Sequence, residues 1–221
     1  MLNEVRSCKA GKKIIVFGAT GGTGKLVVEQ ALLAGHEITV VVRNPAAFTL
    51  CDKNLEIIKG DVLQPGSFEN EIKDKDAVIS CLGIKQRIPT TIYSEGITNI
   101  INAMQKQNVS RIICLSAAAV IIPPKSSLLM KFVTRNILQK IFKYSYADML
   151  VMEKILAGSN LNYTIIRPPW LRDTKRTGKY RVTINEYLSD PSKISRADLA
   201  EYIVNHLTDE KIFRARVEIS Y

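Results

Sequence analysis

The sequence predicts one α/β domain in which a doubly wound parallel sheet carries helices on both faces. Seven short runs rich in β-branched residues recur along the 221-residue chain, at 13–19, 37–43, 55–62, 76–83, 111–117, 162–169 and 216–220. Helix-like segments separate most of these runs, which are apolar on both faces, as strands between two helical layers must be. A hydrophobic content of 46% is sufficient for one such core. We therefore expect residues 12–221 to form a single domain, preceded by an N-terminal extension at 1–11.

Local signals place individual helices between these strands. Gly35 follows the run LVVEQALLA, at the position where a helix commonly ends. The tetrapeptide SRAD at 195–198 is similar to a capping box and precedes LAEYIVNHL. Residues 120–145 break the alternation, because two prolines end a strand edge and a basic amphipathic helix follows. We interpret this segment as a lid-like insertion beside the site.

A glycine-rich turn lies between the first strand and the first helix, in the stretch FGATGGTG at 17–24. Glycine permits a tight turn and lets backbone N–H groups approach phosphate oxygens, while the helix N-terminus adds partial positive charge. The spacing is GxxGxxG rather than GxGxxG, and an ordinary β–α turn also contains glycine. Because repeating β–α units surround it, we predict that the turn binds a dinucleotide through Gly18, Thr20, Gly21, Gly22, Thr23 and Gly24.

The second and third strands indicate which dinucleotide binds. Arg43 ends the second strand, in VVVRNP, with no carboxylate beside it. An Asp or Glu there typically binds the ribose 2′-hydroxyl of NAD, whereas an arginine suits the 2′-phosphate of NADP. The position therefore favours NADP(H), the alternative being an arginine that is merely solvated. Asp61 and Val62, after the third strand, are placed near the adenine, although Asp61 also suits a turn cap.

The catalytic pair of the common short-chain dehydrogenases is absent. Those enzymes use YxxxK, which places a phenol and an ammonium one helical turn apart so that the cation lowers the pKa of the phenol. No tyrosine from Tyr93 to Tyr202 has a lysine four residues later. Ser116, at the carboxyl end of the fifth strand, is placed to orient a carboxamide or a substrate carbonyl, or simply to bond the backbone. No base accompanies it, and without GxSxG a serine hydrolase is disfavoured.

The acceptor side of the site is predicted from IIRPPWL at 165–171. Trp170, the only tryptophan, is placed to stack on a planar substrate or to seal the edge of the core. With a net charge of +10, two basic clusters either attract an anionic substrate or form solvated faces. A helix lying on a membrane is a less favoured interpretation of the first cluster. The clusters are Lys125, Lys131, Arg135, Lys140 and Lys143, and Arg172, Lys175, Arg176, Lys179 and Arg181.

Composition argues against several other classes of protein. The four cysteines are scattered and two lie in apolar runs, which indicates reduced thiols and a cytoplasmic location. The two histidines are far apart, so no metal site is expected. No apolar run reaches the about 20 residues that span a bilayer. Nucleic-acid binding is not expected, because no aromatic platform accompanies the basic clusters.

Several motifs beyond the glycine turn resemble the atypical short-chain dehydrogenases of the NAD(P)H-binding type, most closely the flavin reductase/biliverdin-IXβ reductase group. They are IIVFGATGGTG, VVVRNP, GDVLQP, DAVISCLGIKQRIPTTIYSEGITNII, TGKYRVT and ISRADLAEYIVNHLTDE. The similarity begins at about Lys12 and is weakest over 120–150. It implies a monomeric Rossmann enzyme that passes hydride from NADPH to flavins or linear tetrapyrroles. It also implies cofactor contacts at Gly18, Thr20, Gly21, Thr23, Gly24, Arg43, Asp61, Val62, Leu82, Gly83, Lys85 and Ser116.

Three positions depart from the pattern of that group. Ala47 replaces a second arginine, which weakens the expected grip on the 2′-phosphate. Lys85 replaces an arginine and keeps the charge but not the planar fork. Trp170 replaces a pocket histidine, so the substrate and any proton donor at that position are open.

We therefore expect an NADPH-dependent reductase of a planar, conjugated, anionic acceptor held by Ala117, Pro169 and Trp170, with Ser116 orienting the groups. A flavin would then be a substrate rather than a prosthetic group. The alternative is a regulatory protein that senses NADP(H) without turnover, which the missing proton donor favours. An epimerase or ketone reductase is disfavoured by the absent YxxxK.

Overall fold

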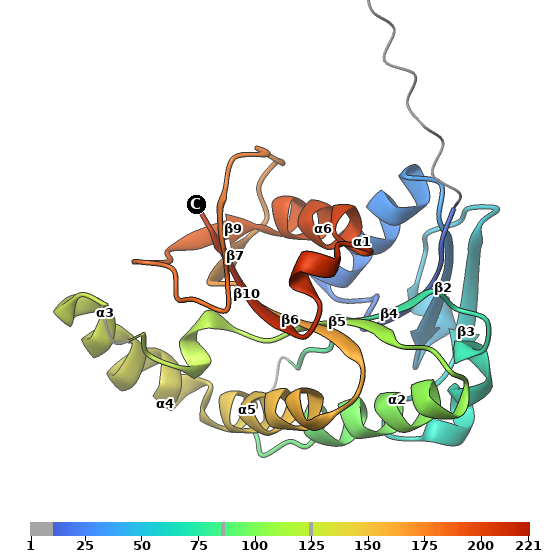
Figure 1. Cartoon of the computed structure of the whole chain (residues 1–221), viewed down its shortest axis with the longest axis horizontal. Helices are drawn as coiled ribbons and strands as arrows, with labels where there is room; N and C mark the ends of the chain where they lie inside the picture. The colour runs from blue at the N-terminus through green and yellow to red at the C-terminus, as the bar shows by residue number, and fades with distance from the viewer. Residues whose placement is uncertain (1–10, 85–86, 124–125) are drawn as a thin grey trace, which may run out of the picture.

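The computed structural model describes residues 11–84, 87–123 and 126–221. Its main sheet has the order β3-β2-β1-β4-β5-β6-β10-β8 (Figure 1). The strands are β1 (Lys13–Phe17), β2 (Glu37–Val42), β3 (Leu55–Lys59), β4 (Ala77–Ser80), β5 (Arg111–Leu115), β6 (Asn162–Arg167), β8 (Arg181–Ile184) and β10 (Ala215–Ser220). Every pair in this sheet is parallel except β10 with β8. The doubly wound fold and all seven predicted strands are confirmed.

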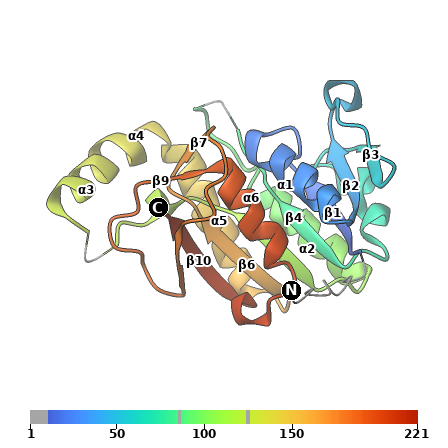
Figure 2. The same ribbon diagram turned by 90° about the horizontal axis from the view of Figure 1, so that it is seen from above.

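Helices cover both faces of the sheet (Figures 1 and 2). On one face α1 (Gly22–Leu33) packs beside α6 (Arg196–Asn205), and on the other α2 (Ser94–Lys106) packs beside α5 (Lys143–Gly158). Alternate residues of β1 explain the two layers, since Ile14 and Val16 pack in the α1/α6 core and Ile15 and Phe17 in the α2/α5 core. Strands buried on both faces in this way must be apolar throughout.

The strand order reverses at β1, which lies between β2 and β4. The first three strands extend the sheet in one direction from this point and the later strands extend it in the other. Open α/β sheets bind ligands outside the carboxyl ends of the strands at such a reversal. The fold therefore places the candidate site where the residues after β1, β4 and β5 meet.

Hydrogen bonds complete the ends of three helices, α2, α6 and α1. The first turn of α2 is capped from α5, because the Asp148 carboxylate accepts hydrogen bonds from the backbone N–H of Tyr93 (2.9 Å) and from the hydroxyl of Ser94. At α6 the predicted capping serine is confirmed, since Ser195 Oγ accepts from Asp198 N at 2.9 Å. At α1, Gly35 N donates to Leu32 O at 2.9 Å just after the helix end, as the sequence predicts.

Three strands and the details of one segment are not predicted from the sequence. β7 (Trp170–Arg172) and β9 (Lys193–Ser195) form a separate parallel pair, and β8 joins the sheet edge. β7 and β9 have only three residues each, too few for an alternating pattern to be recognised. The helix expected within 120–145 is divided into α3 (Leu128–Val133), a π segment (Thr134–Leu138) and α4 (Gln139–Ile141).

The Asp198 carboxylate ties the loop after β7 and the chain end to α6. It accepts hydrogen bonds from the backbone N–H groups of Thr177 (2.9 Å) and Gly178 (2.7 Å), from Ser195 Oγ (2.8 Å) and from the hydroxyl of Tyr221. Burial alone would raise the pKa of Asp198, but these hydrogen bonds outweigh it and lower the pKa to about 2.

We expect Asp198→Asn to lower the free energy of unfolding at neutral pH by about 2 kcal/mol, because the carboxylate loses hydrogen bonds that favour its charged form. The folded-state pKa lies below the ordinary value of 3.8, so this contribution is complete above that value and is lost as the pH falls towards about 2. Urea unfolding followed by circular dichroism at several pH values measures both effects.

Asp190→Asn is the matched control, because Asp190 is exposed and an asparagine tolerates its positive φ of 48°. The difference between wild type and Asp198→Asn should shrink as the pH is lowered. A difference that is constant with pH would show that the charge of Asp198 does not matter.

Candidate dinucleotide site

Two close backbone approaches define the turn after β1. Gly18 has a φ of +76°, and a Cβ built on it would lie 2.3 Å from the carbonyl oxygen of Cys81. A Cβ on Gly24 would lie 2.3 Å from the carbonyl oxygen of Gly18. The loops after β1 and β4 therefore touch, and the first turn of α1 presses against the end of β1. Only glycine fits at either position.

The N-terminus of α1 provides a cradle for an anion. Its N-cap residue, Gly21, has no side chain to occupy the first-turn N–H groups, and no acidic residue lies in that turn. Thr20, Gly21 and Gly22 are exposed, whereas Thr23 is buried. Exposed N–H groups and the positive end of a helix dipole fit the pyrophosphate of a dinucleotide. The structure thus brings the predicted glycines and threonines together in one turn, with Thr20, Gly21 and Gly22 on its exposed side.

Arg196 is a residue of this site that the sequence analysis missed. It is the first residue of α6, and a Cβ on Gly22 would lie 3.0 Å from its Cδ and Nε atoms. Its Nη1 donates to Asp173 Oδ1 at 2.7 Å, which anchors the guanidinium beside the turn. The positive charge of Arg196 therefore lies next to the phosphate cradle, in addition to the partial positive charge of the helix N-terminus. The only sequence signal is the arginine at the first position of a capped helix.

The residues predicted to select the dinucleotide lie at the ends of β2 and β3. Arg43 directly follows β2 and is exposed, as is Ala47 in the short 3₁₀ turn Pro45–Ala47. Asp61 accepts a hydrogen bond from Leu63 N at 3.0 Å, so it has the role of a turn cap that the sequence left open. Val62 is buried and contributes its carbonyl to Asn99 Nδ2 at 3.0 Å.

The loop after β4 supplies the remaining predicted cofactor positions. Leu82 is half-buried and Gly83 is exposed, directly after Cys81, whose carbonyl lies against Gly18. The backbone N–H of Ile84 donates to the hydroxyl of Tyr93 at 3.3 Å, which ties the loop to the start of α2. Lys85 lies outside the described residues, as does Lys125 of the first basic cluster.

Ser116 is held by a buried ion pair. Its hydroxyl donates to Glu153 Oε1 at 2.6 Å, and Arg167 Nε donates to the same oxygen at 2.9 Å. Arg167 also forms a short contact with Glu153 Oε2. Burial alone would lower the pKa of Arg167, but its hydrogen bonds to Glu153 and the negative charges of Glu153 and Glu218 outweigh that and raise it. The serine hydroxyl is thus committed to a carboxylate, a contact that local sequence could not predict.

A second buried carboxylate extends this cluster to β10. Glu218 accepts from Leu188 N at 2.9 Å, and burial raises its pKa. Arg167 Nη1 has no hydrogen-bond partner among the described residues, although it is buried. Charged side chains from α5, β6 and β10 therefore meet beneath the carboxyl ends of the strands.

The predicted acceptor residues lie on the same side of the molecule as this cluster. Ala117 follows Ser116, and its neighbour Ala118 donates its N–H to Pro168 O at 2.9 Å, which joins the chain after β5 to the double proline after β6. Pro169 is half-buried, and Trp170 is 62% exposed. The alternative in which Trp170 seals the core edge therefore does not hold, and the indole is free to contact a ligand.

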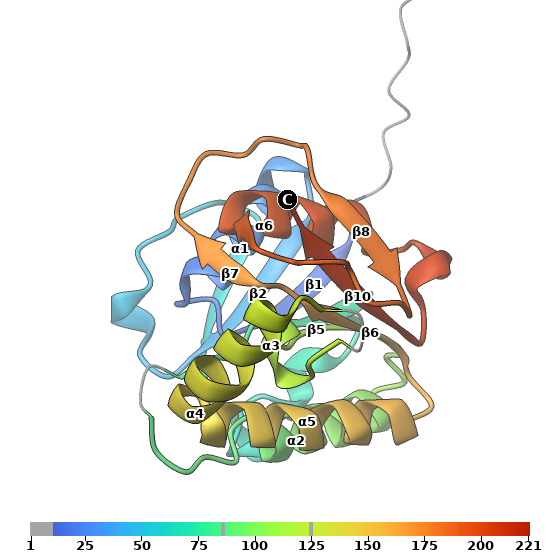
Figure 3. The ribbon, with the colours of Figure 1, turned by 90° about the vertical axis from the view of Figure 1, so that its left-hand side faces the viewer.

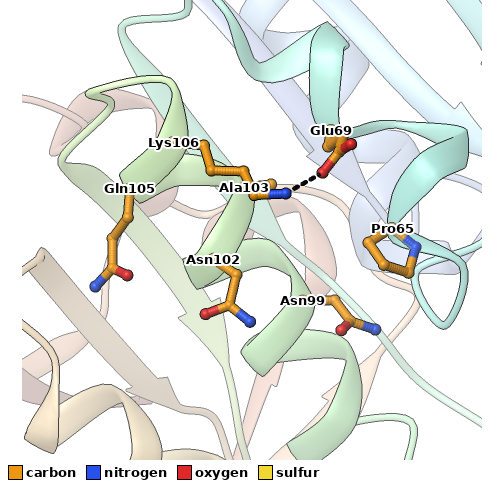
Figure 4. A pocket seen from close by; sticks show the side chains of 7 residues that line it. All are labelled: Pro65, Glu69, Asn99, Asn102, Ala103, Gln105 and Lys106. Carbon is orange, nitrogen blue, oxygen red and sulfur yellow. Dashed lines mark hydrogen bonds and ion pairs between the residues drawn. The ribbon is translucent and has the colours of Figure 1, made fainter.

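Other hollows and clusters do not coincide with this site. A cavity of about 350 Å³ lies between α2 and the turns after β3, lined by Pro65, Glu69, Asn99, Asn102, Ala103, Gln105 and Lys106 (Figure 4). Lys106 Nζ is paired with Glu69 Oε2 there at 2.8 Å. None of the predicted site residues lines this cavity.

The described part of the chain contains neither a cluster of metal-binding side chains nor a membrane-spanning helix. In residues 11–84, 87–123 and 126–221, no three His, Cys, Asp or Glu side chains gather where they could hold a metal ion. Within the same ranges, none of the helices has the length and apolar character needed to cross a membrane.

The turn geometry agrees with a family match that covers most of the chain. The model of the NAD(P)H-binding family matches residues 18–210, which begin at the first glycine of the turn. The chain belongs to the NAD(P)H-binding family. Membership shows that the chain binds NAD(P)H, and the exposed N-terminus of α1 is the candidate place for the pyrophosphate of that cofactor.

Members and neighbours of the family share most of the fold. An uncharacterised chloroplastic protein of Arabidopsis thaliana is 30% identical over 98% of this chain and 79% of its own length. The photosystem II assembly factor Ycf39 of Synechocystis is 29% identical over 70% of this chain, which spans only 44% of that protein. A solved structure from Streptococcus pneumoniae, provisionally named an NADH-flavin reductase, superposes with a TM-score of 0.78 at 23% identity, covering 95% of this chain and 99% of its own.

We expect Gly24→Ala to weaken NADPH binding at least about tenfold, because the added Cβ must displace the carbonyl of Gly18 and distort the cradle. A fluorescence titration with NADPH measures the loss. Gly158→Ala is the control, since a Cβ there meets no atom within 4 Å. NADPH binding by Gly24→Ala that equals that of the control would contradict the role of this close approach.

The buried pair is expected to stabilise the fold as a coupled unit. Glu153→Met should lower the free energy of unfolding by about 3–5 kcal/mol, because it leaves Arg167 charged and unpaired in the interior. Glu153→Met combined with Arg167→Met should lose much less than the sum of the single changes. Urea unfolding of the single and double variants gives the coupling energy. Simple additivity would mean that the two side chains do not act together.

Proposed function

We propose that the protein is an NADPH-dependent reductase that delivers hydride to a planar, conjugated, anionic acceptor such as a flavin or a linear tetrapyrrole. The observation that carries the proposal is the combination of an NAD(P)H cradle with an exposed Trp170 beside Ala117 and Pro169. Family membership supplies the NAD(P)H part, and the chemistry of the acceptor side supports the rest. In this proposal residues 12–221 act as one domain and work as a monomer.

The preference for NADPH is supported by Arg43. It is exposed at the carboxyl end of β2, and the sequence contains no Asp or Glu between Glu37 and Asp52. A guanidinium binds a 2′-phosphate with charge-assisted hydrogen bonds, whereas the 2′-hydroxyl of NAD lacks its carboxylate partner. Ala47, exposed nearby, adds no charge, so Arg43 carries the selection on this side.

The acceptor is argued from shape and charge. An exposed indole offers a flat surface for a conjugated ring system. Arg172, Lys175 and Lys179 are exposed in the loop that follows Trp170 and attract an anion. The name of the Streptococcus pneumoniae neighbour adds a flavin as the first acceptor to test.

The residues of this chain position the reactants and leave the proton to solvent. Bound NADPH supplies a hydride from its nicotinamide ring. Ser116 cannot serve as a free acid, because its hydroxyl proton is directed to Glu153 at 2.6 Å. Its oxygen can still accept a hydrogen bond from a carboxamide, which is the orienting role proposed for it. Positioning then provides most of the rate, and water protonates the reduced acceptor.

A second candidate is a regulatory protein that binds NADP(H) without turnover. The absent YxxxK pair and the engaged hydroxyl of Ser116 favour it. It is also favoured by the similarity to Ycf39, which is named as an assembly factor. The cytoplasmic location stays a prediction, and the Arabidopsis relative is designated chloroplastic.

We expect the protein to oxidise NADPH when FMN, biliverdin or dichlorophenolindophenol is supplied, as followed by the loss of NADPH absorbance. Arg43→Asp should raise the KM for NADPH about 10–100-fold, because the 2′-phosphate loses a charge-assisted partner and meets a like charge. The same variant should favour NADH. Trp170→His, which keeps a planar ring but reduces its area, should change the KM for the acceptor and leave NADPH binding intact.

The two candidate functions give different results in this experiment. Tight NADPH binding without reduction of any acceptor, in both the wild type and Trp170→His, would overturn the reductase and favour the regulator. Lys53→Asp, at an exposed lysine before β3, is the charge control for Arg43→Asp. An equal effect of the two changes would remove Arg43 from the cofactor site.

A further inference from the structure

The segment from α3 to α4 presents apolar side chains to solvent at one end of the molecule. In Figures 1 and 2 α3 lies at the extreme left, beyond the sheet and its covering helices, and Figure 3 looks onto this end. Leu128, Leu129 and Phe132 are 85%, 73% and 61% exposed. Their spacing of one and four residues places them on one side of the helix, away from the buried Thr134. We define these three residues as the apolar tip.

Basic residues flank the apolar tip without any acidic neighbour in the sequence. Lys131 lies between Leu129 and Phe132, and Arg135, Lys140 and Lys143 follow the tip, while no Asp or Glu occurs between Glu95 and Asp148. Arg135, Lys140 and Lys143 are exposed, and none of the ion pairs among the described residues involves them. A solvated lid helix would show the basic residues but would not require three large apolar side chains in water.

We propose that this end of the molecule binds the surface of an anionic membrane, with the apolar tip inserted between the lipids and the basic residues on the headgroups. The inference is independent of the reductase. Amphipathic helices that lie in a membrane interface combine Leu and Phe on one side with Lys and Arg at the border. The tip is a projecting helix end rather than a groove, which suits a soft lipid surface.

The position of the helix joins this surface to the predicted acceptor side. Gln139 Nε2 donates to Ala119 O at 3.2 Å, two residues after Ala117. The base of the segment therefore touches the chain that leaves Ser116, while its tip faces outward. A protein held by this tip would keep the mouth of its site near the membrane.

The test is sedimentation of the protein with vesicles of phosphatidylcholine alone or mixed with phosphatidylglycerol. The wild type should bind the mixed vesicles and bind phosphatidylcholine much more weakly, with binding that falls as salt is raised. Leu128→Glu combined with Phe132→Glu should reduce binding at least about tenfold, because each apolar side chain that inserts into the membrane is replaced by a charged one that the lipid interior excludes. Arg135→Glu combined with Lys140→Glu should reduce it about 20-fold or more.

Matched controls distinguish an effect of the apolar tip from the effect of adding a charge at any exposed position. Leu33, 88% exposed at the end of α1, is changed to Glu, and the exposed Lys53 is changed to Glu. Both controls should bind mixed vesicles nearly as the wild type does. NADPH binding by all variants, which does not involve α3, reports that they are folded.

Three results would overturn the proposal. The first is a wild type that binds neither vesicle, and the second is a tip variant that binds as well as the Leu33→Glu control. The third is a wild type that does not bind vesicles and elutes from a size-exclusion column as a dimer, whereas the tip variant elutes as a monomer. The tip would then be an interface between two copies of the chain.

Discussion

The contact between the carbonyl of Gly18 and the bare Cα of Gly24 is the constraint on which the rest of the arrangement depends. It lets α1 start immediately after β1, so that the helix end and the strand end face the same crevice. Gly18 makes a second close approach to the carbonyl of Cys81, which fixes the loop after β4 against the same turn. At the reversal of strand order the turn is therefore packed backbone against backbone, and no side chain caps the N-terminus of α1, where a phosphate would bind.

The acceptor half of the site is built differently, from charged side chains in the interior. Glu153 and Arg167 join α5 to β6 and hold Ser116, while Glu218 brings β10 into the same cluster. Such groups cost desolvation free energy and are stable only when they are paired. Their role here is positional, since Ser116 after β5, Glu153 of α5 and Arg167 of β6 share one set of hydrogen bonds.

Patterns that depend on neighbouring residues were predicted well from the sequence. All seven expected strands, the glycine turn, the cap at Ser195 and the end of α1 at Gly35 follow from periodicity and backbone chemistry. Contacts between distant residues were not predictable in this way. The bond from Ser116 to Glu153 spans 37 residues, and Arg196 reaches Gly22 from the far part of the chain. The placement of Trp170 likewise involves the pairing of β7 with β9, two strands that are too short to be recognised in the sequence.

The predicted site residues also differ in whether their roles depend on neighbouring or on distant residues. Asp61 caps its own turn, a local possibility that the sequence had already offered. Ser116, predicted to orient a carboxamide or a substrate carbonyl, donates its hydroxyl to a carboxylate of α5, which leaves its oxygen only as a hydrogen-bond acceptor. The family match establishes that the chain binds NAD(P)H, whereas the acceptor depends on side chains that sequence similarity does not fix.

The cap that Asp148 provides for α2 links two helices in their stability. The N-cap residue of α2, Tyr93, provides no capping side chain, and its own N–H donates to Asp148 of α5 at 2.9 Å, while the N–H of Glu95 is bonded locally to Thr91 O. The start of α2 is thus completed only when α5 has docked, and opening of α5 exposes it. The loop after β4, bonded to Tyr93, belongs to the same cooperative unit. One wall of the crevice therefore forms and opens as a block, while the opposite wall at α1 is held by its own turn.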